Sequence, residues 1–164
     1  MTTKGVMNHE DGNVLVITLI ILVALTFLGI TSTRMSSIDL LVSGNKKIYS
    51  ENLYNAETAA YYAVQTMSYT NLDASRPAWL SDSLGAITEA DVMNDSNWDN
   101  DSFTGVNVGT NIADAKYVAI YSGVAEVGMS LDMAKTKVRS YSVYGRSEKH
   151  RGKSMVEIGF RKAF

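Results

Sequence analysis

The amino-acid sequence predicts an α+β fold. We expect a long N-terminal helix that crosses a membrane with its first half and carries a small antiparallel β-sheet on its second half. Three observations predict it. No charged residue occurs from Gly12 to Thr33, an apolar stripe with helical spacing follows from Tyr49 to Met67, and β-type residues dominate from Lys116 onward. The 164 residues leave room for one anchor and one modest globular domain.

The uncharged run is long enough to cross a bilayer. Its 22 residues span about 33 Å as a helix, which matches the hydrocarbon core of a membrane. We therefore interpret residues 13–34 as a transmembrane helix. Its large apolar side chains are expected to face lipid or partner helices, and the main ones are Val14, Leu15, Ile17, Leu19, Leu22, Leu25 and Leu28.

The residues before this run leave three interpretations. A cleaved signal peptide needs a basic leading region and a small-residue cleavage site after the run, whereas the leader carries Lys4 against Glu10 and Asp11. An uncleaved anchor needs only the run itself, and its flanking charges orient it weakly. In the third, residues 1–12 form a leader removed between Gly12 and the following asparagine, because glycine lets the backbone extend into a peptidase site.

Residues 35–69 are expected to continue the helix as an amphipathic segment that enters the globular domain. Glycine and asparagine within Ser43–Asn45 predict a short break there, as a local kink or a loosened turn. Beyond it, apolar residues recur at steps of three and four and define one helical face. We expect this face to pack on the sheet through Tyr49, Leu53, Ala56, Ala60, Val64 and Met67.

Residues 70–164 form the expected globular domain. Its first part, residues 70–114, is rich in polar residues and predicts loops with one short helix around Leu84–Met93. Thr88 with Asp91 and Ser81 with Leu84 offer capping chemistry for this helix. Its second part, residues 115–164, predicts an antiparallel sheet. The expected strands are Lys116–Val124, Val138–Gly145 and Ser154–Arg161, and a charged turn over Arg146–Lys153 joins the last two.

The composition argues against an enzyme. The chain has no cysteine and only two histidines, His9 and His150. This excludes disulfides, thiolate chemistry and sites built from several histidines. No nucleophile elbow, phosphate loop or paired-carboxylate motif occurs, so we expect no catalytic residue and no cofactor.

Charge is distributed unevenly along the globular domain. Residues 70–114 hold eight acidic residues against the single base Arg76, and residues 135–162 hold nine basic residues against two acidic ones. Either the two regions form opposed faces for a partner, or the acidic loops neutralise the basic strands within the domain. The cluster Arg146, Lys149, His150, Arg151 and Lys153 predicts a solvated hairpin turn, and we do not expect it to bind nucleic acid.

One acidic segment resembles a calcium loop. Asp95, Asn97, Asp99 and Asp101 place oxygen atoms at alternate positions, but the glycine and glutamate of an EF-hand are missing, which favours a solvated loop without a metal. The tryptophans Trp79 and Trp98 lie in the same region. They are either core residues or contacts for a partner, and the sequence leaves both interpretations open.

Four elements of the N-terminal part occur in an order that resembles the PilX family of type IV pilus minor pilins. They are Gly12-Asn-Val-Leu-Val, Leu25-Thr-Phe-Leu-Gly29, Val42-Ser-Gly-Asn45 and Asn52-Leu-Tyr-Asn-Ala-Glu-Thr-Ala-Ala60. The resemblance covers roughly the first 67 residues. It implies a pilin-like fold, cleavage by a prepilin peptidase after Gly12, and methylation of the new amine on Asn13.

The resemblance also implies a location and a set of partners. The chain would be held as a single-pass protein in a bacterial inner membrane and then be extracted into an extracellular pilus. Its implied partners are other minor pilins and a large tip adhesin, and it would support pilus assembly or cell adhesion.

One residue departs from the pattern of major pilins. They carry a glutamate at the fifth mature position, and counting from Asn13 this chain has Ile17 there. The departure favours a priming or tip subunit over a shaft subunit. The alternative hypothesis is a membrane-anchored envelope protein with a ligand-binding or enzymatic outer domain.

Overall fold

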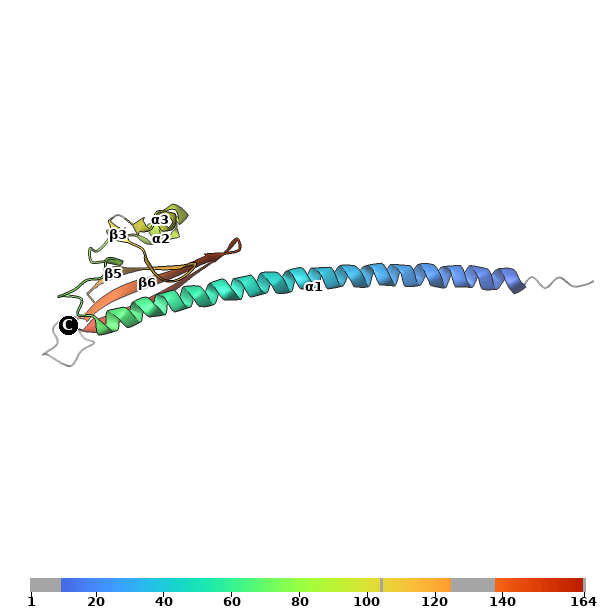
Figure 1. Cartoon of the computed structure of the whole chain (residues 1–164), viewed down its shortest axis with the longest axis horizontal. Helices are drawn as coiled ribbons and strands as arrows, with labels where there is room; N and C mark the ends of the chain where they lie inside the picture. Colours follow the sequence, from blue (N-terminus) through green and yellow to red (C-terminus); the bar gives the residue numbers. More distant parts are fainter. Residues whose placement is uncertain (1–9, 104, 125–137, 164) are drawn as a thin grey trace, which may run out of the picture. The chain divides into compact units, whose positions relative to one another are not determined.

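The computed structural model describes residues 10–103, 105–124 and 138–163 (Figure 1). The chain forms two units, residues 1–45 and residues 46–164. The first unit contains the first part of helix α1, and the second contains the remainder of α1 and all the strands.

Helix α1 runs from Glu10 to Tyr69 and has 60 residues. The helical conformation continues through Ser43–Asn45, so the break in the helix predicted there is wrong. A glycine inside a helix costs only about 1 kcal/mol relative to alanine, and the flanking leucine, valine and lysine residues tolerate the helical conformation well.

The second unit is built on a five-stranded sheet. Strands β5 (Ala115–Val124), β6 (Val138–Lys149) and β7 (Gly152–Ala163) form an antiparallel meander, which confirms the three predicted strands. The short strands β1 (Leu80–Ser81) and β4 (Gly109–Ile112) also pair with β5, and the β1 pairing is parallel. The order along the main path is β1-β5-β6-β7, which leaves β7 at one edge.

The turn between β6 and β7 is shorter than predicted. Both strands extend into the segment Arg146–Lys153, and only His150 and Arg151 connect them. These two residues have positive φ values of 52° and 64°, the combination that a two-residue type I′ hairpin turn requires. Strand pairing therefore overrides the local charge pattern, and Arg146 belongs to a strand.

The polar region before β5 contains more structure than predicted. Helix α2 (Glu89–Met93) is shorter than the predicted Leu84–Met93, and of the two predicted caps it starts at the one where Thr88 and Asp91 form a reciprocal capping box. Helix α3 (Asp95–Asp99) follows, with the hairpin of β2 (Ser102–Phe103) and β3 (Val106–Asn107) behind it. Neither α3 nor this small hairpin was predicted from the sequence.

Two apolar clusters cover the two faces of the sheet. On one face, the second part of α1 contributes Ala59, Ala60, Ala63 and Met67 to a cluster with β5 and β6. On the other face, Val118 and Tyr144 pack with the α2–α3 region, whose members are Ile87, Val92, Trp98 and Phe103. The sheet is thus the middle layer of three (Figure 1).

Candidate functional site

The apolar segment at the start of α1 is exposed in the structure. The seven large side chains predicted to face lipid or helices have exposed fractions between 50% and 68%: Val14, Leu15, Ile17, Leu19, Leu22, Leu25 and Leu28. Among the described residues, α1 is the one helix whose length and composition suffice to cross a membrane, and its most apolar window buries nothing. A contiguous apolar surface of this size marks a membrane or protein interaction site.

Polar side chains within this segment are satisfied by the helix itself. The Thr18 hydroxyl donates to the Leu15 carbonyl at 2.9 Å, and the Thr26 hydroxyl donates to the Leu22 carbonyl at 2.7 Å. The Thr31 hydroxyl lies within hydrogen-bond distance of the Phe27 and Leu28 carbonyls in the preceding turn. Because these donors need no water, the segment can enter hydrocarbon or a dry interface between helices without losing hydrogen bonds.

The predicted cleavage site lies at the start of this helix. Since α1 begins at Glu10, both Gly12 and Asn13 belong to its first turn. Residues 1–9 lie outside the described residues, so the leader and its removal stay predictions.

The face of α1 toward the sheet differs slightly from the predicted stripe. Ala56, Ala60 and Met67 are fully buried, and Val64 packs at the rim of the cluster. Leu53 is only partly buried. The remaining predicted member, Tyr49, has the correct helical spacing but is 60% exposed.

Tyr49 is exposed because the sheet ends near its level on the helix. A Cβ atom built on Gly152, the first residue of β7, would lie 2.9 Å from the Ile48 side chain and 2.7 Å from the Asn52 amide nitrogen. The turn of the hairpin therefore reaches Ile48 but gives Tyr49 little cover.

Asn52 is the fully buried residue that the apolar stripe missed. Its amide nitrogen donates to the Lys149 carbonyl at 3.1 Å, and its amide oxygen accepts a hydrogen bond from the Ser147 hydroxyl at 3.1 Å. The side chain thus joins α1 to the end of β6 by two polar contacts. Asn52 lies four residues before Ala56 and therefore on the same helical face. The predicted stripe did not include it because the stripe was defined by apolar residues alone.

Close contact between α1 and β6 depends on small residues. A Cβ atom built on Gly145 would lie 2.1 Å from the Ala56 carbonyl oxygen and 2.9 Å from the Ala60 Cβ. Glycine on the strand and alanine on the helix therefore bring the two backbones together, which fixes how this part of α1 sits on the sheet.

Arg146 connects the α2–α3 region to the sheet. Its side chain is 5% exposed. The guanidinium lies 2.6 Å from the Glu148 carboxylate and 3.2 Å from the Asp95 carboxylate, and sits over the Trp98 ring at 5.7 Å from the centroid. The predicted solvated position of Arg146 is therefore wrong. Its place two residues beyond Tyr144 in the alternating strand pattern was the signal for this inward orientation.

Ion pairs join the acidic region to the basic strands, as the second interpretation of the charge pattern predicts. Asp73 pairs with Arg139 at 2.7 Å, and Asp101 pairs with Lys116 at 2.7 Å. The Lys153 ammonium donates a hydrogen bond to Asp95, which lowers the pKa of that carboxyl.

The hairpin carries a further ion pair. The ammonium of Lys149 lies 2.6 Å from the Glu51 carboxylate on α1. This hydrogen bond lowers the pKa of Glu51 and raises the pKa of Lys149. Much of the basic cluster is therefore neutralised within the domain.

The four oxygen-bearing residues of the calcium-like segment do not form a metal site together. Asp95 and Asp101 face cationic side chains, and the Asn97 amide nitrogen donates to the Asp91 carbonyl at 2.9 Å. Within the described part of the chain, no group of three or more His, Cys, Asp and Glu residues could hold a metal ion. Asp99 ends helix α3.

Both tryptophans pack inside the domain. Trp98 is 1% exposed, meets the Phe103 ring edge-on at 5.0 Å, and donates its indole hydrogen to the Val92 carbonyl at 2.8 Å. Trp79 packs against the Tyr117 ring at 5.1 Å and lies at the rim of the other cluster. Trp98 is therefore a core residue between the α2–α3 region and the sheet.

A long helix that is apolar and exposed at its start and packed on an antiparallel sheet at its end defines a pilin-like α+β protein. Residues 11–60, about a third of the chain, match the model of the PilX N-terminal family. The match confirms the predicted resemblance, and it relates this part of the chain to type IV pilus-related pilins, which are structural pilus components. No curated protein and no solved structure matches the chain.

Proposed function

We propose that the chain is a minor pilin-like structural subunit of a type IV pilus or a related secretion filament, at a priming or tip position. The observation that carries the proposal is the exposed apolar segment Val14–Ile30, together with the family match over residues 11–60. The segment has no cover in its own unit, so it needs a bilayer or other chains around it.

The mechanism is an exchange of neighbours around this helix. Each large apolar side chain gains about 1.5–3 kcal/mol on leaving water, which holds the helix in a bilayer. Lipid tails and leucine side chains are similarly apolar, so moving from lipid to a bundle of helices changes this energy little. Packing against neighbouring helices can then draw the subunit from the inner membrane into an extracellular filament.

Ile17 supports a position at the tip or a role in priming. After cleavage at Gly12 the new amine of Asn13 is positively charged, and the first carboxylate along the mature chain is Asp39. The chain therefore offers no nearby partner for the amine of a subunit stacked on it. A subunit with this property suits the end of a filament, where the expected partners are other minor pilins and a tip adhesin.

The N-terminus of the mature protein tests the proposal. In cells that contain a prepilin peptidase, mass spectrometry should find a chain that begins at Asn13 and carries one added methyl group. A chain that keeps Met1 in such cells, or that is freely soluble, contradicts the proposal. It would favour the membrane-anchored envelope protein with a binding or enzymatic outer domain.

Ile17→Glu tests the position in the filament. We expect this variant to change the amount of the subunit recovered in sheared filaments, because it supplies the missing carboxylate. Ile17→Leu is the matched control, since it keeps an apolar side chain of the same size. Equal recovery of the glutamate variant, the leucine variant and the natural chain would remove the argument for a tip position.

A further inference from the structure

Strand β7 forms a long edge of the sheet that no other described strand pairs with. All 12 of its residues pair with β6 without a register shift, so the strand is regular over its full length. Natural edge strands are protected by being short, by bulges, by proline or by charged side chains. The described part of β7 is long, unbulged and free of proline, and its protection is limited to the charged side chains of Lys153, Glu157, Arg161 and Lys162.

The hairpin geometry decides which backbone groups face this edge. In a two-residue hairpin the flanking residues, here Lys149 and Gly152, form a hydrogen-bonded pair. Hydrogen-bonded pairs then alternate, so even-numbered residues of β7 use their backbone groups toward β6. The odd-numbered residues from Lys153 to Ala163 direct their N–H and C=O groups to the open edge.

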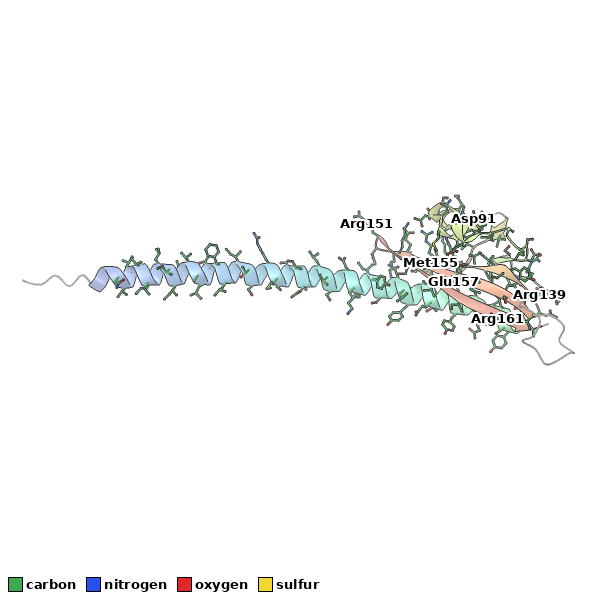
Figure 2. All side chains as sticks on the ribbon, turned by 180° about the vertical axis from the view of Figure 1, so that it is seen from behind. Asp91, Arg139, Arg151, Met155, Glu157 and Arg161 are labelled. Atoms are coloured by element: carbon green, nitrogen blue, oxygen red, sulfur yellow. The ribbon has the colours of Figure 1, made fainter. Side chains whose placement is uncertain are left out.

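The side chains at this edge follow two rows. The odd-numbered row contains Met155, Glu157, Gly159 and Arg161, and three of these residues are labelled in Figure 2. The even-numbered row, on the side of α1, contains Val156, Ile158 and Phe160, which are partly buried. The edge therefore combines opposite charges four residues apart on one face with an apolar strip on the other.

We propose that the β7 edge binds an extended segment of a partner protein, which adds an antiparallel strand to the sheet. Charge complementarity sets its sequence. An acidic residue lies opposite Arg161, a basic residue four positions later lies opposite Glu157, and the residue between them lies opposite Gly159. Apolar residues at the two intervening positions lie opposite Phe160 and Ile158, as cross-strand pairing favours.

The orientation of α1 argues against a second copy as the occupant. Within the second unit, α1 passes Gly152 at Asn52 and reaches Lys162 at Met67, where the Lys162 ammonium donates to the Met67 carbonyl at 2.6 Å. The helix thus runs in the same direction as β7. Antiparallel pairing of two β7 strands would make the two α1 helices antiparallel, whereas subunits drawn from one membrane into one filament are parallel; this step rests on the proposed function.

Short peptides test the edge directly on the full chain in detergent. The probe is a labelled nine-residue peptide with the central order Glu-Val-Thr-Val-Lys, N-methylated at both valines. These two residues face away from β7, so the peptide can pair through only one edge and cannot form fibres. Saturable binding is expected, and exchanging the Glu and Lys of the peptide should weaken it about tenfold.

Two controls separate backbone pairing from simple charge attraction. A peptide N-methylated at Glu, Thr and Lys keeps the charges but blocks the pairing edge, and we expect it not to bind. Gly159→Pro removes an edge N–H group and should weaken binding about tenfold, whereas Gly159→Ala keeps this group and should bind normally. A Cβ atom built on Gly159 meets no atom within 4 Å, so alanine fits.

The result can overturn the proposal in two ways. Equal binding of both methylated peptides, or no binding at all, shows that β7 does not accept a strand. Because the chain has no natural cysteine, Gly159→Cys also reports self-pairing: a disulfide-linked dimer through residue 159 would make a second copy the occupant. None of these outcomes depends on the N-terminal cleavage or filament recovery that test the proposed function.

Discussion

Gly145→Ala should detach the helix from the sheet more effectively than alanine at any other described glycine of the strands. The new Cβ would lie 2.1 Å from the Ala56 carbonyl oxygen, whereas ordinary contact begins at 3.4 Å. Helix and strand must therefore separate by about 1.3 Å, because the obstacle is backbone that cannot rotate away.

The cost of this separation can be worked from the contact. Overpacking a core by one methyl group costs about 1–3 kcal/mol. A gap of about 1 Å already removes up to about half of the dispersion energy of neighbouring contacts, here those of Ala59, Ala63 and Val143. We expect a loss near 3 kcal/mol in the free energy of unfolding, or roughly 10 °C in Tm for a domain of this size.

Thermal unfolding of the full chain in detergent, followed by the fluorescence of buried Trp98, measures this loss. Gly159→Ala is the matched control on the neighbouring strand and should stay within about 0.5 kcal/mol of the natural chain. Adding Ala60→Gly to Gly145→Ala should not restore stability, because the contact with the Ala56 oxygen remains. A Gly145→Ala protein that unfolds with the natural chain would refute the close-contact argument.

Three further predictions concern the charged groups. Arg146→Met should lower the free energy of unfolding by about 2 kcal/mol in a thermal scan, less than for a fully buried pair because its carboxylate partners keep access to water. Lys162→Met removes the ammonium that donates to the Met67 and Ser68 carbonyls at the end of α1 and should speed hydrogen exchange in its final turn, with a loss of about 1–2 kcal/mol. Hydrogen bonds from Thr88 lower the pKa of Asp91, and the bond from Lys153 lowers that of Asp95. The folded chain then binds fewer protons than the unfolded chain in acid, so stability present above about pH 4 should fall as the pH drops through the folded pKa values, as a series of Tm measurements would show. Thr88→Ala should raise the NMR-measured pKa of Asp91 only part of the way to its ordinary value, because the hydroxyl is lost but the backbone N–H of residue 88 still donates to the carboxylate.

Much of this fold could be predicted because its strongest signals are local. The uncharged run, the helical spacing and the three β-rich segments each occupy a continuous stretch of sequence. Thr88 and Asp91 likewise marked the start of α2 correctly. The elements that were missed, such as β1 and the β2–β3 hairpin, have two residues per strand and exist because longer elements hold them in place.

The errors share one physical cause, which is that tertiary contacts decided the role of polar residues. Arg146 has the local surroundings of a turn but is buried by Trp98 and two carboxylates. Asn52 interrupts the apolar stripe but is buried because two partners in β6 satisfy its amide. Glu148 lies two residues from Arg146, but Asp95, Trp98 and both partners of Asn52 are distant in sequence, so no local pattern could supply those contacts.

The two parts of α1 differ in whether the chain covers their apolar residues, and this difference explains why one helix can serve two purposes. From Ala56 to Met67 the buried face is mostly alanine, and it is complete once the sheet covers it. From Val14 to Ile30 the large side chains surround the helix, so no single face could cover them. The domain core therefore does not depend on these side chains, which leaves the segment free to exchange one apolar environment for another. Charged substitutions at Leu22 should accordingly change membrane retention while leaving the thermal unfolding of the globular domain unchanged.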